Sequence, residues 1–182
     1  LSVLGADDGG ESNLTYTWSA TTKPAGSAPL FSANGSNAAK AATVTFDKAG
    51  SYTFQVTISD GTNSVTSSIA VTVDQTLTTI AVSPSTPSLT LNGSQAFAAV
   101  AYDQFGDLVA VQPAFTWSIL SGVGSVDAAG LYQAPSTIGA AVVQATAGSV
   151  NGTATITVTD AGPTVAAAAS AAPGTVTATT TV

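Results

Sequence analysis

The sequence predicts an all-β protein made of two β-sandwiches in series, and two observations support this prediction. Apolar and polar residues alternate with a period of two in short runs that Gly, Asn, Asp and Pro separate, as expected of strands with one buried face. The two halves of the chain also resemble each other. Tyr16–Ser19 (YTWS) matches Phe115–Ser118 (FTWS), and Ala49–Tyr52 (AGSY) matches Ala129–Tyr132 (AGLY). An internal repeat of this size indicates two sandwich modules.

Four alternating runs predict the strands of the first half. In the first run, Leu14, Tyr16 and Trp18 share one face, which indicates a half-buried strand. The segment between Thr21 and Lys40 is too irregular to assign. The predicted strands are Leu14–Ala20, Thr43–Phe46, Ser51–Ile58 and Ser64–Val73. The residues of the last strand that are expected on one side are Val65, Ile69, Val71 and Val73.

The second half contains more and shorter runs of the same type. The predicted strands are Leu77–Val82, Leu89–Leu91, Gln95–Tyr102, Ala114–Ile119, Leu131–Tyr132, Ala140–Ala147 and Thr153–Val158. Asp103 and Asp107 flank a Gln-Phe-Gly segment, which is typical of a turn capped by Asp. We therefore expect one sandwich in residues 1–75, a second in residues 76–162, and a separate strand segment in residues 163–182.

The composition argues against several classes of function. The 182 residues include no His and no Cys, so the commonest general base, the thiol nucleophile and the usual zinc ligands are missing, and an enzyme is not expected. Lys23, Lys40 and Lys48 are the only cationic side chains, too few for a nucleic-acid surface. Every apolar stretch is broken within a few residues, so membrane insertion is not expected. Low charge with many small residues fits a protein of the cell surface or the extracellular space.

Two families of known domains resemble the two halves. The segments LGADDGGESNLTYTWSA and AGSYTFQVTISDG resemble a polycystic-kidney-disease (PKD) type domain, an immunoglobulin-like sandwich common in bacterial surface proteins and secreted enzymes. The segments LTLNGSQAFAAVAYDQFGD, FTWSI and GSVDAAGLYQAP are similar to bacterial immunoglobulin-like (Big-type) modules of adhesins and tandem arrays. Together, the resemblances imply two immunoglobulin-like sandwiches at an extracellular or cell-surface location.

Residues 163–182 are expected to complete the first domain of another unit. A PKD-type domain normally opens with a Pro-containing strand segment that precedes the position of Leu1, and residues 163–182 have that character. A sandwich without its opening strands exposes a sheet edge, so the tail of one unit is expected to cover the next, and such head-to-tail contact propagates. The residues expected to make this assembly contact are Thr175, Val176, Ala178 and Val182 of the tail, with Leu1 and Val3.

The assembly admits three interpretations. In the first, the units are covalently continuous repeats, which we favour because the break falls inside what should be one strand. In the second, separate chains are joined by donor strands. In the third, the chain ends at a cloning boundary and the tail is unstructured. The predicted function is an extracellular structural protein that forms a filament, stalk or adhesin fibre, with a second copy as its partner. The alternative is a spacer or carbohydrate-binding module of a secreted bacterial enzyme. Thr175–Thr181 also offers acceptors for O-glycans.

The sequence also contains candidate metal-binding and core residues. Carboxylates with turn carbonyls are ligands that Ca²⁺ prefers, and calcium is known in relatives of the PKD family, although a solvated turn explains the same residues. No other cofactor is expected. The candidate calcium ligands are Asp7, Asp8, Glu11 and Asp60. The aromatic residues expected in the cores are Trp18, Tyr52, Phe54, Trp117 and Tyr132.

Overall fold

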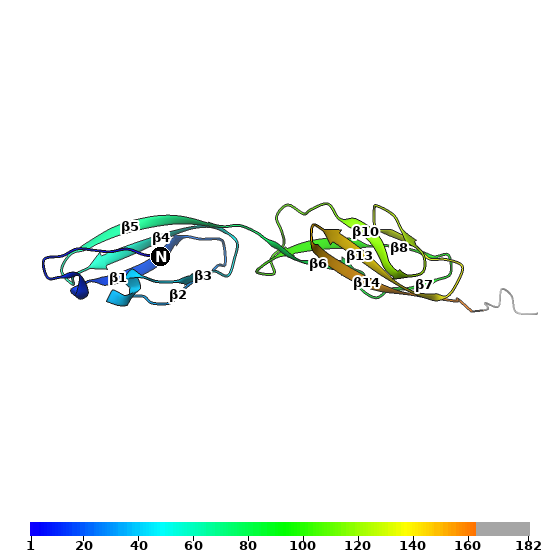
Figure 1. Cartoon of the computed structure of the whole chain (residues 1–182), viewed down its shortest axis with the longest axis horizontal. Helices are drawn as coiled ribbons and strands as arrows, with labels where there is room; N and C mark the ends of the chain where they lie inside the picture. Colours follow the sequence, from blue (N-terminus) through cyan, green and yellow to red (C-terminus); the bar gives the residue numbers. More distant parts are fainter. Residues whose placement is uncertain (163–182) are drawn as a thin grey trace, which may run out of the picture.

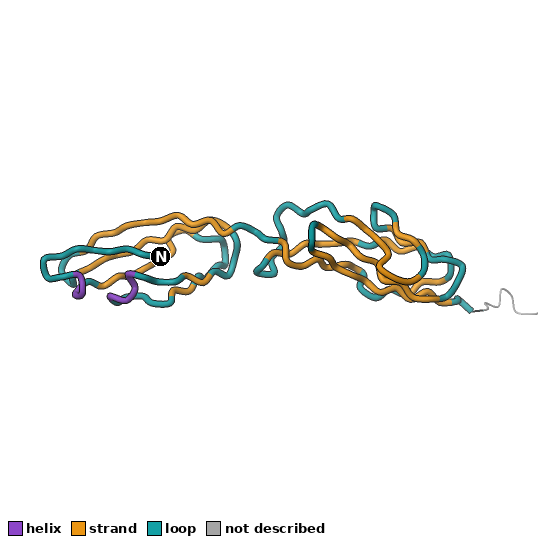
Figure 2. Tube along the Cα trace, viewed as in Figure 1, coloured by secondary structure: helices purple, strands orange, loops and turns teal. Residues whose placement is uncertain are grey.

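The computed structural model describes residues 1–162, and these residues form an all-β protein, as predicted. Strands make up most of the trace, with two single turns of 3₁₀ helix (Figure 2). The chain forms two bodies that follow one another end to end (Figure 1). Each body has its own hydrophobic cluster, and the two clusters share no residue. The expected strand in residues 163–182 lies outside the described residues.

The first body packs a three-stranded antiparallel sheet against a short two-stranded one. The sheet order is β1-β4-β5, and β2 pairs with β3. Aromatic rings join the two sheets, since Phe31 meets Phe54 edge to face at 5.6 Å between ring centroids. The elements are η1 (Glu11–Asn13), β1 (Thr15–Thr22), β2 (Leu30–Phe31), η2 (Asn37–Lys40), β3 (Val44–Thr45), β4 (Gly50–Ser59) and β5 (Ser64–Val73).

The second body has a four-stranded sheet in the order β10-β13-β14-β7, in which β7 runs parallel to β14. A three-stranded sheet, β11-β12-β8, and the pair β6-β9 complete it. The elements are β6 (Leu77–Ser83), β7 (Ser88–Thr90), β8 (Ser94–Ala96), β9 (Ala98–Asp103), β10 (Thr116–Gly122), β11 (Ser125–Val126), β12 (Leu131–Gln133), β13 (Gly139–Ala147) and β14 (Val150–Thr159).

Only one of the two sequence matches between the halves marks equivalent positions. Trp18 of β1 is paired with Val56 of β4, and Trp117 of β10 is paired with Ala145 of β13, so β4 corresponds to β13. The AGSY match was wrong as a structural repeat, because its first copy leads into β4 and its second into β12, a strand of a different sheet. A Gly followed by an aromatic residue suits the start of either strand, so the local pattern does not distinguish them.

The last strands of the two bodies are equivalent, but their burial differs. In β14, Ile156 and Val158 are buried, whereas in β5 Val65 and Ile69 are 66% and 49% exposed, although they pair with buried residues of β4. Strand β7 pairs with the outer edge of β14, and β6 approaches it so closely that a side chain on Gly152 would meet the backbone of Ile80. Within residues 1–162, no strand pairs with the outer edge of β5.

This difference predicts unequal costs for the same substitution. Ile156→Ala is expected to destabilise the second body by about 2–5 kcal/mol, because it opens a cavity among buried side chains. Ile69→Ala is expected to destabilise the first body by roughly 1 kcal/mol, because half of the side chain already contacts water. Urea unfolding monitored by tryptophan fluorescence, at concentrations where light scattering shows a single unit, measures both. Equal costs would contradict the exposure of the β5 face.

Candidate assembly surface

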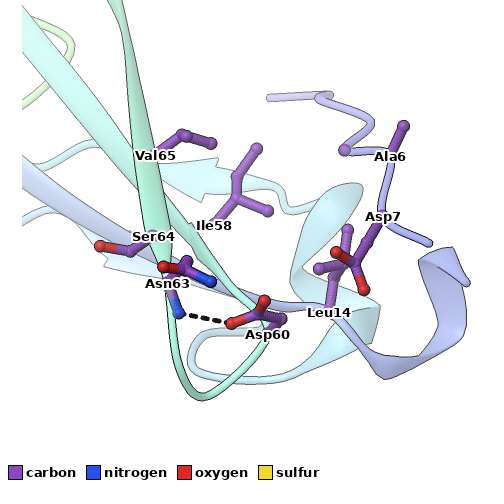
Figure 3. Close-up of a pocket in the computed structure, with 9 residues that line it drawn as sticks. Ala6, Asp7, Leu14, Ile58, Asp60, Asn63, Ser64 and Val65 are labelled. Atoms are coloured by element: carbon purple, nitrogen blue, oxygen red, sulfur yellow. Dashed lines mark hydrogen bonds between the residues drawn. The ribbon is translucent and has the colours of Figure 1, made fainter. Parts of the chain in front are cut away.

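A row of three hollows follows the uncovered face of β5. Each hollow has one apolar β5 residue in its wall, and these are, in order along the strand, Val65, Ile69 and Val71. Figure 3 shows the first hollow, where Ile58, Leu14 and Val65 lie next to the turn between β4 and β5. Core-facing residues of one strand thus line three hollows that follow one another along it, and the second and third hollows share Leu1. We call this row of hollows the β5 groove.

The opposite wall of the β5 groove comes from the start of the chain and from the segment around β3. Leu1 lines the second and third hollows, Val3 lines the second, and Phe46 lines the third. Leu1 and Val3 are half-buried and pack against the first core cluster. The two N-terminal residues predicted to take part in assembly therefore lie in the groove, whereas the predicted tail residues lie outside the part of the chain that is described.

Backbone hydrogen bonds fix the start of the chain at this place. The Leu1 ammonium donates to the Ala42 carbonyl at 2.8 Å, and the Val3 amide donates to the Lys40 carbonyl at 2.9 Å. Ser2 and Ala41 form an antiparallel bridge between these two bonds. Leu1 and Val3 thus sit where a strand would extend the smaller sheet, directly beside the groove.

The β5 groove is uncharged along most of its length. The second and third hollows are lined by apolar residues and by Ser and Thr, and the sequence of residues 163–182 also lacks charged side chains. Covering such a surface buries no unpaired side-chain charge, which is the costliest failure of a buried interface, and the one charge beside these two hollows, the Leu1 ammonium, is bound by the Ala42 carbonyl. The first hollow differs, because Asp7 and Asp60 line it.

The four candidate calcium ligands are not brought together as a set. Asp7 and Asp60 line the same hollow (Figure 3), Asp8 is exposed, and Glu11 binds Lys40 in an ion pair of 3.0 Å. Among residues 1–162, no group of three or more acidic, His or Cys side chains is placed to hold a metal ion. Calcium binding stays a prediction without a formed site.

The carboxylates near this turn already have partners. The Lys40 ammonium, together with hydrogen bonds from Tyr16 and Asn37, holds the pKa of Glu11 below its ordinary value. The backbone amides of Asn63 and Thr62 donate to Asp60 and lower its pKa in the same way. These contacts hold η1 and the β4–β5 turn in place, so Glu11 and Asp60 each have a structural role.

The aromatic residues expected in the cores have two kinds of surroundings. Those with 5% exposure or less are Trp18, Tyr52, Phe54 and Tyr132. The Trp18 indole donates to the Ala39 carbonyl at 2.7 Å and so fixes η2 over the first core. Trp117 is half-buried at the margin of the second core, with its ring centroid 6.3 Å from that of Phe97.

The linker between the bodies is anchored by side-chain contacts that no sequence pattern predicts. The Gln75 side chain donates to the Asp103 carboxylate at 3.0 Å and to the Leu108 carbonyl at 2.9 Å, and it accepts from the Ala110 amide at 2.8 Å. The Gln104 side chain accepts from the Thr76 amide and donates to the Asp74 carbonyl. These bonds fix the linker to the loop that follows β9.

Asp103 connects this linker to the turn after β9. Its carboxylate is buried and accepts from the amides of Phe105 and Asp107, which confirms that it caps the turn. Burial raises the pKa of Asp103, but hydrogen bonds from Gln75 and from backbone amides outweigh it and hold the pKa below its ordinary value. One carboxylate therefore stabilises both the turn and the interdomain junction.

An ion pair also crosses the junction. Lys48 of the first body lies 3.6 Å from the Asp107 carboxylate of the second. Both side chains are partly exposed, so the pair is worth little on its own and mainly favours one orientation of the two bodies.

Comparison with known proteins identifies part of the fold. Residues 1–73 match the family model of the PKD domain, which confirms the first resemblance over that range. The Big-type assignment of the second half stays a prediction. No curated protein matches the chain. No helix within residues 1–162 is long and apolar enough to span a membrane.

Several solved structures align with this chain at low sequence identity and with TM-scores below 0.5. Domains 4 and 5 of the S-layer protein SbsC align at 16% identity over 85% of this chain and 78% of that chain, with a TM-score of 0.41. The D00-D0 domain of intimin aligns at 17% identity over 82% and 87% of the two chains, with a TM-score of 0.44. In the structure of SbsC domains 1–6, the aligned part is 21% of that chain. At these identities the likeness concerns the fold alone.

The role of Asp103 predicts a pH dependence. Because its folded-state pKa lies below the unfolded one, the carboxylate stabilises the fold above the unfolded pKa of about 3.9, and this contribution is lost as the pH falls through the folded-state value. Asp103→Asn is expected to cost about 1.5–3 kcal/mol at pH 7 and to flatten the acid side of the stability profile. Asp160→Asn, at an exposed position, is the control. Urea unfolding of the second body, followed by Trp117 fluorescence in a Trp18→Phe background, measures both; an unchanged profile in Asp103→Asn would refute the role.

Proposed function

We propose that the chain is a repeating unit of an extracellular structural or adhesive protein, and that its units join head to tail through residues 163–182. The match of residues 1–73 to the PKD domain supports a surface role, since the sequence resembles modules common in bacterial surface proteins. The low charge content supports the same location. In this proposal the two sandwiches are spacers, and the tail of each unit covers the β5 groove of the next.

The uncovered face of β5 carries the proposal. Val65 and Ile69 are apolar residues on the core-facing side of a sheet, yet they are 66% and 49% exposed. A strand with both a free edge and an uncovered apolar face is a template for pairing with another chain, and natural proteins usually cover such edges. An extended segment that adds to the edge gains main-chain hydrogen bonds and buries the groove.

The position of β14 supports a contact between different units rather than within one. The end of β14, after which residues 163–182 follow, lies on the side of the second sandwich that is remote from the first (Figure 1). A contact between two different surfaces of a unit is heterologous, and heterologous contacts that do not close into a ring extend into open arrays. The Gln75 and Asp103 contacts would keep each unit extended along that array.

The proposal has a covalent and a non-covalent form, and both bring the same surfaces together. In the covalent form, Val182 is followed directly by Leu1 of the next repeat. In the other form, separate chains donate their tails. The mass of native material after full denaturation separates them: a species of 17.7 kDa indicates separate units, and a much larger one indicates a continuous array.

The distribution of aromatic residues favours this function over carbohydrate binding. Sugar-binding surfaces use exposed aromatic rings as platforms, whereas the Trp, Tyr and Phe side chains of the described chain are buried or half-buried. Trp18 fills the first core, and Trp117 packs against the second.

A charge placed in the β5 groove is expected to prevent assembly. The unaltered chain should increase in mass with concentration in light scattering and form elongated particles in electron microscopy. Ile69→Lys, and separately Val71→Lys, should keep the chain at 17.7 kDa, because the hollows beside these residues have no acidic side chain and covering them would then bury an unpaired ammonium. Leu120→Lys is the matched control, since Leu120 is a 60% exposed strand residue of the second body.

Two results would contradict the proposal. One is native material that has a mass of 17.7 kDa after full denaturation, together with an unaltered chain that stays a single unit at every concentration, since this excludes the covalent and the non-covalent form. The other is normal assembly of both groove variants, with circular dichroism showing that they are folded.

A further inference from the structure

We propose that the part of the tail that pairs with β5 is residues 165–169, running parallel to β5, with Val165 opposite Ile69 and Ala169 opposite Val73. This inference rests on the proposed function, because it takes a second copy of the chain as the source of the strand. It adds the identity, direction and register of the segment, none of which follows from head-to-tail assembly itself.

The second body provides the template for this pairing. There, the segment leading into β7 runs parallel to β14, and the amides of Thr155 and Thr157 donate outward to the carbonyls of Ser85 and Pro87 at 2.9 and 3.1 Å. Strand β7 then pairs Leu89 with Val158. The outer edge of the last strand of a body in this chain is therefore suited to a parallel partner.

The two tryptophans set the equivalence between β14 and β5. Val56, opposite Trp18, pairs with Ser67, and Ala145, opposite Trp117, pairs with Gly152. Ser67 thus corresponds to Gly152, and each residue of β5 corresponds to the residue 85 positions later in β14. By this equivalence, Val73 takes the place of Val158, and the amides of Ala70 and Thr72 take the places of the outward donors Thr155 and Thr157.

The tail sequence fits the same path. In the second body, the β7 segment ends at Asn92-Gly93, where Asn92 has a positive φ of 59°, and β8 follows. In the tail, the run from Val165 ends at Pro173-Gly174, another strong turn signal, and a Thr/Val run follows. Residues 165–169 thus precede a turn signal and a second alternating run in the sequence, as β7 precedes a turn and β8 in the structure.

Side-chain alternation selects the register. Placing Val165, Ala167 and Ala169 on the core-facing side directs the largest apolar residue of the run toward Ile69 and leaves Ser170 on the outer side. The frame shifted by one residue would bury Ser170 instead and leave Val165 in water.

Disulfide trapping tests the inference, since the chain has no Cys of its own. Neighbouring strands lie about 4.8 Å apart, which is within the Cα separation that a disulfide bridges. The register places Ala70 opposite Ala166 and Thr72 opposite Ala168, all on the outer side. Full chains with Ala70→Cys and Ala166→Cys, or with Thr72→Cys and Ala168→Cys, should form a ladder of multimers on a non-reducing gel that dithiothreitol returns to one band.

Using both cysteine pairs tests whether the tail strand runs parallel to β5. A third pair tests which segment of the tail lies beside β5. Both pairs have the same offset, so they link together only if the strands are parallel. Ala70→Cys with Thr179→Cys tests whether the Thr-rich run takes this place, and it should give no ladder. A ladder from the Thr179 pair alone, or from only one of the two predicted pairs, overturns the inference and leaves the proposed function standing. If neither predicted pair forms a ladder, the chain stays a single unit in light scattering, and native material has a mass of 17.7 kDa after full denaturation, both the inference and the proposed function are overturned.

Discussion

The covering of the last strand of each sandwich is the constraint on which the rest of this structure depends. Strands β5 and β14 occupy equivalent places, and both alternate apolar and polar residues, but β6 and β7 cover only β14. Full burial of a Val or Ile side chain is worth about 1.5–3 kcal/mol, so exposure of half or more of Val65 and Ile69 leaves on the order of 1 kcal/mol unrealised at each. A segment that covers both gains this energy together with a row of main-chain hydrogen bonds.

The junction between the sandwiches fixes how the two bodies are oriented relative to each other. Gln75 reaches three groups of the loop after β9, and Asp103 holds both that loop and Gln75. The contacts come from side-chain amides, whose donors and acceptors satisfy the backbone of an otherwise irregular linker. An anchored linker keeps the first body, which carries the β5 groove, and the end of β14 on opposite sides of the junction, so contacts between units add along a line.

The alternation of apolar and polar residues predicts much of this architecture. The features that it does not predict have identifiable physical reasons. The long strands β4, β5 and β13 were predicted within one residue, and β14 within three, because each has a clear buried face and turn residues at its ends. Strands β2 and β11 have two residues each, too few to show a period. The exposure of Ile69 was not predictable, since alternation reports which side faces a core and not whether anything covers it. Gln75 carried no signal, because a polar residue in a linker is ordinary.

The two forms of the proposed assembly face different costs, and the composition of the tail bears on which is stable. Ordering a strand costs about 1–2 kcal/mol per residue, and joining separate molecules adds an estimated 4–15 kcal/mol. The run from Val165 is mostly alanine, so it buries little apolar area to offset these terms. A covalently continuous chain avoids the second cost, because its tail meets the next groove at a high effective concentration. A weakly apolar strand is therefore sufficient within a continuous array, whereas separate units would depend strongly on concentration.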